Sequence, residues 1–116
     1  MSPTAHAQLL GHVVAAGEDL LAALPLRGGL VGGEGAIGVG TVQLWLSRPQ
    51  LVGGASVAAV PLADVGAGAA RERRFGGGLE LRLVLSGREV AFATGAGRDA
   101  VEGFLRELAR AQRTAS

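Results

Sequence analysis

Few side chains in this sequence have the chemistry of a catalyst. The chain contains no Cys, Lys or Tyr, and its only imidazoles belong to His6 and His12. The stretch Gly54-Ala55-Ser56-Val57-Ala58 approaches the G-x-S-x-G elbow that presents a catalytic serine, but its last residue is not glycine and no His follows it. Because nucleophilic and acid–base catalysis need such groups held beside one another, we predict that the protein is not an enzyme.

Metal and cofactor sites are not indicated either. Residues six apart in a helix point about 240° away from each other, so His6 and His12 predict no shared metal ion. Residues 33–38 fit the pattern G-x-G-x-x-G but lead into strand-like residues. Residues 95–100 resemble the same pattern with Ala in place of its last Gly, yet only residues 101–116 follow, too few for the rest of a dinucleotide-binding unit. We therefore expect no cofactor.

Two segments carry side chains suited to binding. In residues 71–75, three Arg side chains beside Phe75 offer bidentate donors for an anionic headgroup or an acidic partner, although a solvated loop tip is the simpler interpretation. In the glycine-rich segment 28–35, two apolar side chains that follow Arg27 are suited to insertion into a membrane. The candidate residues of these segments are Arg27, Leu30, Val31, Arg71, Arg73, Arg74 and Phe75.

Composition limits the classes of partner. Apolar residues make up 48% of the chain and charged residues 18%, below the roughly 25% usual in soluble domains, so we expect a partner or a second copy to cover part of the surface. A net charge of +1 disfavours nucleic acid. The lack of Cys, of a signal-like N-terminus and of an apolar run of about 20 residues predicts a cytoplasmic protein.

The N-terminal part of the chain predicts a helix followed by a strand. Apolar residues at helical spacing indicate a helix over residues 5–16, and a strand follows over residues 19–26. The apolar stripe of this helix is a candidate interaction surface made of Leu9, Leu10, Val13 and Val14. We assign residues 1–17 to an N-terminal helical extension, 18–113 to a single main domain and 114–116 to a tail.

Strand patterns fill the middle of the chain. They occur at residues 36–40, 41–46 and 57–60, with a weaker one over 64–71. In the second of these, Val42 shares a face with Leu44 and Leu46, whereas Trp45 lies on the other face. A lone Trp is more often a covered core residue than an exposed binding anchor, and we expect the former.

The clearest elements lie near the C-terminus. Leucines alternate with other residues over 79–85, and Ser86-Gly87 can form a two-residue turn. The register then pairs Leu85 with Arg88, Leu83 with Val90 and Leu81 with Phe92. An amphipathic helix follows over residues 99–112, with Asp99 as its cap.

These patterns resemble the bacterial pleckstrin-homology-like (PH-like) domains, relatives of the GRAM domains. The resemblance covers residues 18–111 and rests on Gly35-Ala36-Ile37-Gly38-Val39-Gly40-Thr41 with the strand after it, on Val60-Pro61-Leu62-Ala63-Asp64-Val65, and on the leucine hairpin before the last helix. It implies a mainly β fold with α: a PH-like barrel of about seven antiparallel strands, capped by the C-terminal helix and preceded here by a short N-terminal helix. It also implies no catalytic activity.

The resemblance leads to two hypotheses of function. The first is a binding or assembly module that acts through protein–protein interaction or self-association, most simply as a homo-oligomer. The alternative is peripheral membrane or small-lipid binding through the glycine-rich loop and the Arg cluster. Val42 and Gln43 replace the basic residues usual after Thr41, and the chain has no Lys, so phosphoinositide recognition is not expected.

Overall fold

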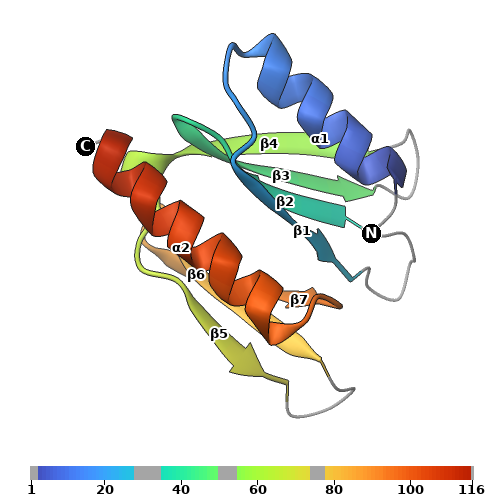
Figure 1. Ribbon diagram of the computed structural model, residues 1–116, viewed down its shortest axis with the longest axis vertical. Coiled ribbons are helices and arrows are strands. Elements are labelled where there is room, and N and C mark those ends of the chain that lie inside the picture. Colours follow the sequence, from blue (N-terminus) through green and yellow to red (C-terminus); the bar gives the residue numbers. More distant parts are fainter. Residues whose placement is uncertain (1–2, 28–34, 50–54, 74–77, 116) are drawn as a thin grey trace.

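The described part of the chain forms seven strands and two α-helices (Figure 1). The computed structural model describes all residues except 1–2, 28–34, 50–54, 74–77 and 116. In chain order the elements are α1 (Pro3–Ala15), β1 (Ala22–Leu26), β2 (Gly35–Val39), β3 (Gln43–Pro49), β4 (Ala55–Pro61), the 3-10 turn η1 (Leu62–Asp64), β5 (Ala69–Glu72), β6 (Leu79–Leu85), β7 (Arg88–Thr94) and α2 (Arg98–Ala115).

The strands make two antiparallel sheets in which chain neighbours are sheet neighbours. One sheet has the order β1-β2-β3-β4 and the other β5-β6-β7. They approach at two corners, where the Arg27 N–H donates to the Ala93 carbonyl (2.8 Å) and where Val65 forms an isolated bridge with Leu85. The predicted mainly β class with helices is confirmed, but the two sheets are not closed into a barrel.

The β6–β7 hairpin has the predicted register. Leu85 faces Arg88, Leu83 faces Val90 and Leu81 faces Phe92. The turn places Ser86 at φ 51° and Gly87 at φ 84°, the left-handed conformations of the turns that suit the strand twist. Alternate leucines of β6 therefore point into the core.

The main core lies between the two sheets and α2. The helix contributes Val101, Phe104, Leu108 and Ala111, all buried. It begins at Arg98 and runs to Ala115, so Asp99 lies within the first turn rather than at the cap, and the residues predicted as a tail continue the helix through Ala115. No Gly or Pro follows residue 103 to end the helix earlier.

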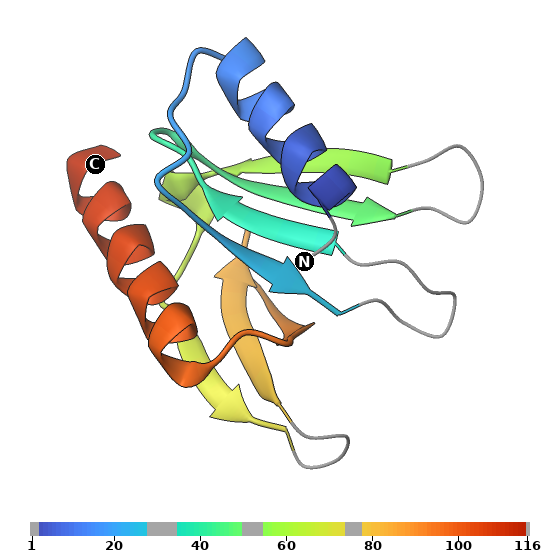
Figure 2. The same ribbon diagram turned by 45° about the vertical axis from the view of Figure 1, so that its right-hand side comes forward.

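A smaller second core lies on the opposite face of the four-stranded sheet, beneath α1. Leu9 and Val13 of α1 pack there with Ala36 and Trp45. Figure 2 shows this sheet with α1 on one side and α2 with the second sheet on the other. The N-terminal helix is thus a layer of the fold, and Trp45 is a covered core residue, as expected for the only Trp of a small domain.

Three strands begin later than predicted. β1 begins at Ala22 instead of residue 19, because residues 17–21 form a connection that bonds to the β2–β3 turn. Thr41 and Val42 form that turn and do not belong to β3. β5 begins at Ala69 because the chain first makes the turn η1.

Candidate interaction surface

The apolar stripe predicted on α1 is divided between the inside and the outside of the molecule. Leu9 and Val13 are 0% exposed, because they form the contact with the four-stranded sheet. Leu10 and Val14 are 40% and 61% exposed. Neighbouring residues of a helix point in directions about 100° apart around its axis, so a buried stripe and an exposed stripe lie side by side. Leu9 and Val13 are therefore not available to a partner.

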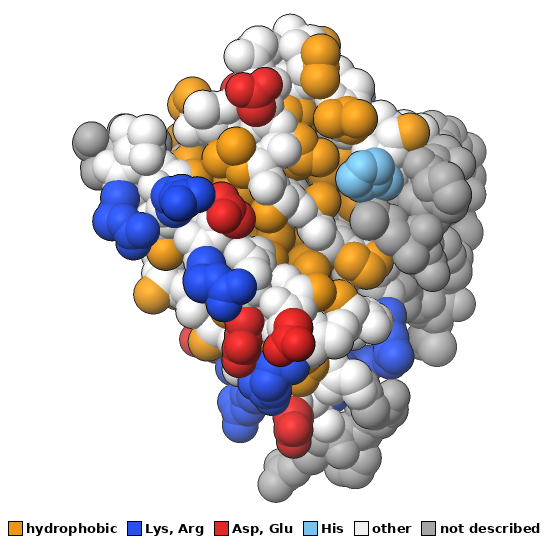
Figure 3. Space-filling model, viewed as in Figure 1, with side chains coloured by type: hydrophobic (Ala, Val, Ile, Leu, Met, Phe, Trp, Pro, Cys, Tyr) orange, Lys and Arg blue, Asp and Glu red, His pale blue; other side chains and the backbone are white. Residues whose placement is uncertain are grey.

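We use the name apolar surface for the exposed large hydrophobic side chains of the described residues. It consists of Leu10, Val14, Leu21 and Val42. Leu21 (42% exposed) lies just before β1, and Val42 (57% exposed) lies in the β2–β3 turn. Figure 3 shows hydrophobic side chains gathered over α1 and the adjoining segment, whereas most charged side chains of this view lie over α2.

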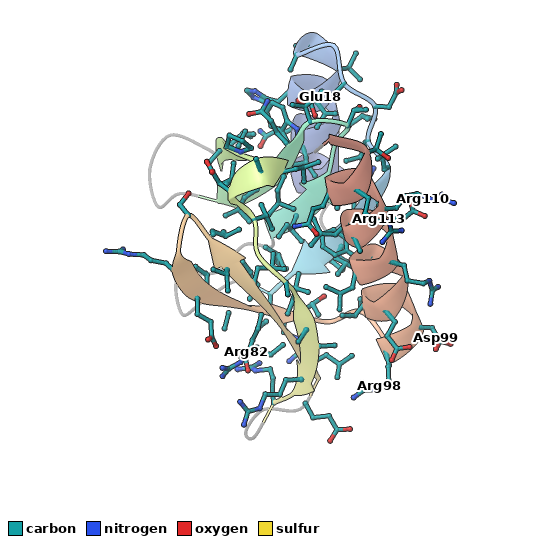
Figure 4. All side chains as sticks on the ribbon, turned by 90° about the vertical axis from the view of Figure 1, so that its left-hand side faces the viewer. Glu18, Arg82, Arg98, Asp99, Arg110 and Arg113 are labelled. Carbon is teal, nitrogen blue, oxygen red and sulfur yellow. The ribbon has the colours of Figure 1, made fainter. Side chains whose placement is uncertain are left out.

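A buried carboxylate joins the parts of the apolar surface. Glu18 Oε1 accepts hydrogen bonds from the backbone N–H groups of Val42 (2.8 Å) and Gln43 (3.0 Å), and Oε2 accepts one from the Gln43 side-chain amide (2.9 Å). Nearby, the Asp19 N–H donates to the Thr41 hydroxyl (3.0 Å). The segment after α1 is thereby attached to the β2–β3 turn, at the end of the molecule where Figure 4 marks Glu18.

The charge of Glu18 is favoured by these partners. Burial, the largest single influence, raises the pKa of the carboxyl group. The donors from Val42 and Gln43, together with the Trp45 indole, lower the pKa by more than burial raises it, so the net pKa lies below its ordinary value. The Trp45 nitrogen faces the carboxylate without a hydrogen bond of good geometry. We therefore treat the three Val42 and Gln43 donors as the main cause of the shift.

Gly40 leaves the space that this arrangement needs. A Cβ atom at this position would overlap Glu18 Oε1 and would lie 2.9 Å from the Trp45 indole nitrogen and 3.1 Å from the Gln43 carbonyl oxygen. All three groups are held in place by the fold. The glycine is therefore required by close approach, since its φ angle is not among the positive ones.

The Arg-containing segments lie away from the apolar surface. Arg71 is exposed on β5 opposite Glu80, and the Arg73 N–H donates to the Gly78 carbonyl (3.1 Å). The Arg27 guanidinium also lies over Gly78, 3.4 Å from where a Cβ atom would be. The Arg27 side chain and the Arg73 backbone thus both lie at Gly78. The remaining candidates, Leu30, Val31, Arg74 and Phe75, are outside the described residues.

Sequence reasoning missed Leu21, Val42 and Glu18. Val42 was expected to share the buried face of Leu44 and Leu46, and that expectation is wrong because the residue belongs to the turn. Glu18 bonds to residues 42 and 43, a contact distant in sequence that no local pattern reveals. Its position just after a helix and before an apolar strand gave no sign of burial.

No three His, Asp or Glu side chains within the described ranges are grouped so as to hold a metal ion. No helix in this part of the chain is both long and apolar enough to cross a membrane. The open hollows among the described residues include one of about 540 Å³ beside η1 and the β6–β7 turn and one of about 320 Å³ among the Arg side chains of α2. Neither is enclosed enough for a small-molecule pocket.

Comparisons with known proteins gave no relative. No family model matches the chain, and no curated protein or solved structure matches it significantly.

Proposed function

We propose that this chain is a non-catalytic interaction module of PH-like architecture that associates with itself or with a protein partner through the apolar surface. The observation that carries the proposal is the exposure of four large apolar side chains, Leu10, Val14, Leu21 and Val42, on α1 and on the two segments that Glu18 links. Exposed large apolar side chains that gather on one part of a surface are characteristic of sites that another protein covers.

The order of the elements supports the PH-like part of the proposal. A meander of four strands is followed by a meander of three, and the chain ends in a helix packed against both sheets. This is the order that the sequence resemblance implies. Two corners at which the sheets approach each other would be the places where such a barrel closes.

The apolar surface is prepared for binding in two ways. Its side chains are already about half covered, so burying the rest would contribute about 1 kcal/mol each, several kcal/mol in total. Its parts are also fixed by the hydrogen bonds of Glu18, so that little backbone order has to be gained on association. A small rigid surface of this kind suits a protein partner better than a flexible ligand.

The test is the mass of the full chain by sedimentation velocity over a range of concentrations. Replacing Leu10→Gln and Val14→Gln together should shift the association at least tenfold to higher concentration, because both side chains lose their apolar contacts. Ala100→Gln, an exposed change on α2, serves as the matched control and should leave association as in the unchanged chain.

Two results would count against this function. One is a chain that stays monomeric at all concentrations and captures no protein partner through this surface. The other is association that the double variant leaves unaltered. Deleting residues 1–17 would not be a clean test, since it would also uncover Trp45 and Ala36.

The second candidate function is binding to an anionic membrane surface. Its supporting observation is that the Arg27 guanidinium and the Arg73 backbone both lie at Gly78, so the segments that carry these two Arg residues approach each other although they are far apart in sequence. In this case the protein should co-sediment with phosphatidylglycerol vesicles at low salt, and Arg27→Gln with Arg73→Gln should reduce the bound fraction. Arg88→Gln, an exposed change in the β6–β7 hairpin, should not. Failure to co-sediment would exclude this alternative.

A further inference from the structure

β4 is an edge strand without the usual protection. It is the last strand of its sheet and pairs with β3 alone among the described strands. Its sequence, ASVAAVP, has no charged residue, and Ala58 and Ala59 are exposed. Edge strands are normally protected from pairing with other chains by charges, bulges or a cover. Among the described residues, the protection consists of the prolines at its end and opposite its start.

The register shows which backbone groups of β4 point outward. The Leu62 N–H donates to the Val42 carbonyl (2.9 Å), and hydrogen-bonded pairs alternate along an antiparallel ladder. Leu44 with Val60 and Leu46 with Ala58 are then the bonded pairs between β3 and β4. The N–H and C=O groups of Val57 and Ala59 point away from β3.

Pro61 agrees with this assignment. It falls at an outward-pointing position of the alternation, where its lack of an N–H costs the ladder no bond. The outer edge of β4 thus offers donors and acceptors at Val57 and Ala59 and an acceptor at Pro61, with a matching donor at Ala55.

From this geometry we propose that β4 pairs with β4 of a second copy of this chain, antiparallel and about a two-fold axis at Ala58. Val57 then pairs with Ala59 of the second copy and exchanges two hydrogen bonds with it, and the symmetry repeats these bonds. The Ala55 N–H faces the Pro61 carbonyl of the second copy. The two four-stranded sheets become one continuous sheet, with both α1 helices on the same face.

A second copy fits this edge for reasons of charge and shape. A strand that meets its own copy brings identical residues together at the axis, so any charge there would face a like charge; β4 carries none. The residue on the axis is Ala58, whose methyl group permits the close approach of a non-bonded pair, with Cα atoms about 4.5 Å apart. The same edge offers no charged side chain by which a different partner would be selected.

This contact is separate from the apolar surface, and its test is therefore independent of the proposed function. Because the chain has no Cys, a single introduced thiol can form a cross-link only at its own position. Ala58→Cys should form a disulfide-linked dimer on mild oxidation, since a non-bonded pair has the Cα spacing of a disulfide. Ala59→Cys, equally exposed but about 7–8 Å from its symmetry mate, is the matched control and should cross-link at least tenfold more slowly.

A second variant protects the test from ambiguity. Ala58→Lys places two positive charges on the axis, and the fluorescence of the only Trp checks that the fold stays intact. This change should weaken dimerisation at least tenfold, whereas Ala100→Lys should leave dimerisation unchanged. Equal cross-linking of the two Cys variants, absence of cross-linking at Ala58→Cys, or association indifferent to Ala58→Lys would each overturn the proposal. Replacing Leu10 and Val14 should weaken association through the apolar surface but leave the Ala58→Cys cross-link in place.

Discussion

Glu18 provides the most quantitative prediction. Replacing Glu18→Ala leaves the N–H groups of Val42 and Gln43 and the Gln43 side-chain amide without their acceptor. Hydrogen bonds to a charged group contribute about 1.5–3 kcal/mol each, and water can replace some of them at this partly buried position, so we expect a loss of about 3 kcal/mol. Asp19→Ala is the matched control and should change stability by less than about 0.5 kcal/mol, because the neighbouring bond uses its backbone N–H.

The assay is urea unfolding followed by the fluorescence of Trp45, the only Trp of the chain, and by circular dichroism. With a slope of about 1–3 kcal/mol per M urea, a loss of 3 kcal/mol lowers the midpoint by about 1–3 M. Glu18→Gln retains an acceptor for the backbone donors but loses the charge, so it should cost about 1–2 kcal/mol.

The pH dependence gives the sign of the effect. The pKa of Glu18 is lower in the folded state than in the unfolded state, where a Glu titrates at about 4.3. Its stabilisation is then fully present above about pH 5 and is lost as the pH falls through the unfolded-state value towards the folded pKa. The difference in stability between the unchanged chain and Glu18→Gln should shrink below about pH 4. A difference that is absent at pH 7, or that is unchanged at pH 3, would refute the reasoning.

Three other perturbations test the remaining parts of the fold. Gly40→Ala should destabilise the protein by about 2 kcal/mol, because the new Cβ atom meets Glu18, Gln43 and Trp45. Gly11→Ala, in an open helical position, should stabilise it by about 0.5–1 kcal/mol. Urea midpoints of the two variants that move in the same direction would contradict this. Leu83→Ala should lower stability by about 2–5 kcal/mol in thermal or urea unfolding, and a change below 1 kcal/mol would deny its place in the core. Deleting residues 1–17 should shift Trp45 emission to longer wavelength and increase the binding of a hydrophobic dye, and unchanged emission would contradict the packing of α1 on the sheet.

The parts of the fold that were predictable have strong local signals. The alternating leucines and the Ser86-Gly87 turn fix the β6–β7 register without knowledge of the rest of the chain. The stripe of Val101, Phe104 and Leu108 likewise identifies the buried side of α2. A shift of the strand register by one residue, or a rotation of the helix by one position, would expose several large apolar side chains at once.

The candidate site was less predictable because long-range contacts decide it. Periodicity groups Leu9 with Leu10 and Val13 with Val14, but only the position of the sheet determines which of each pair is covered. The predicted strand began at residue 41, two residues before β3, so Val42 was placed in a strand although it lies exposed in the β2–β3 turn. Glu18 becomes recognisable as a structural residue only when its partners in the β2–β3 turn are seen.

Hydrogen exchange of the full chain, compared between low and high protein concentration, tests the central claim most directly. We predict added protection at high concentration in α1, in residues 17–21 and in the β2–β3 turn, the segments that carry the apolar surface. Exchange that is independent of concentration throughout, with no partner to change it, or protection confined to the segments around Arg27 and Arg73, would contradict the assignment of this surface as the site of association.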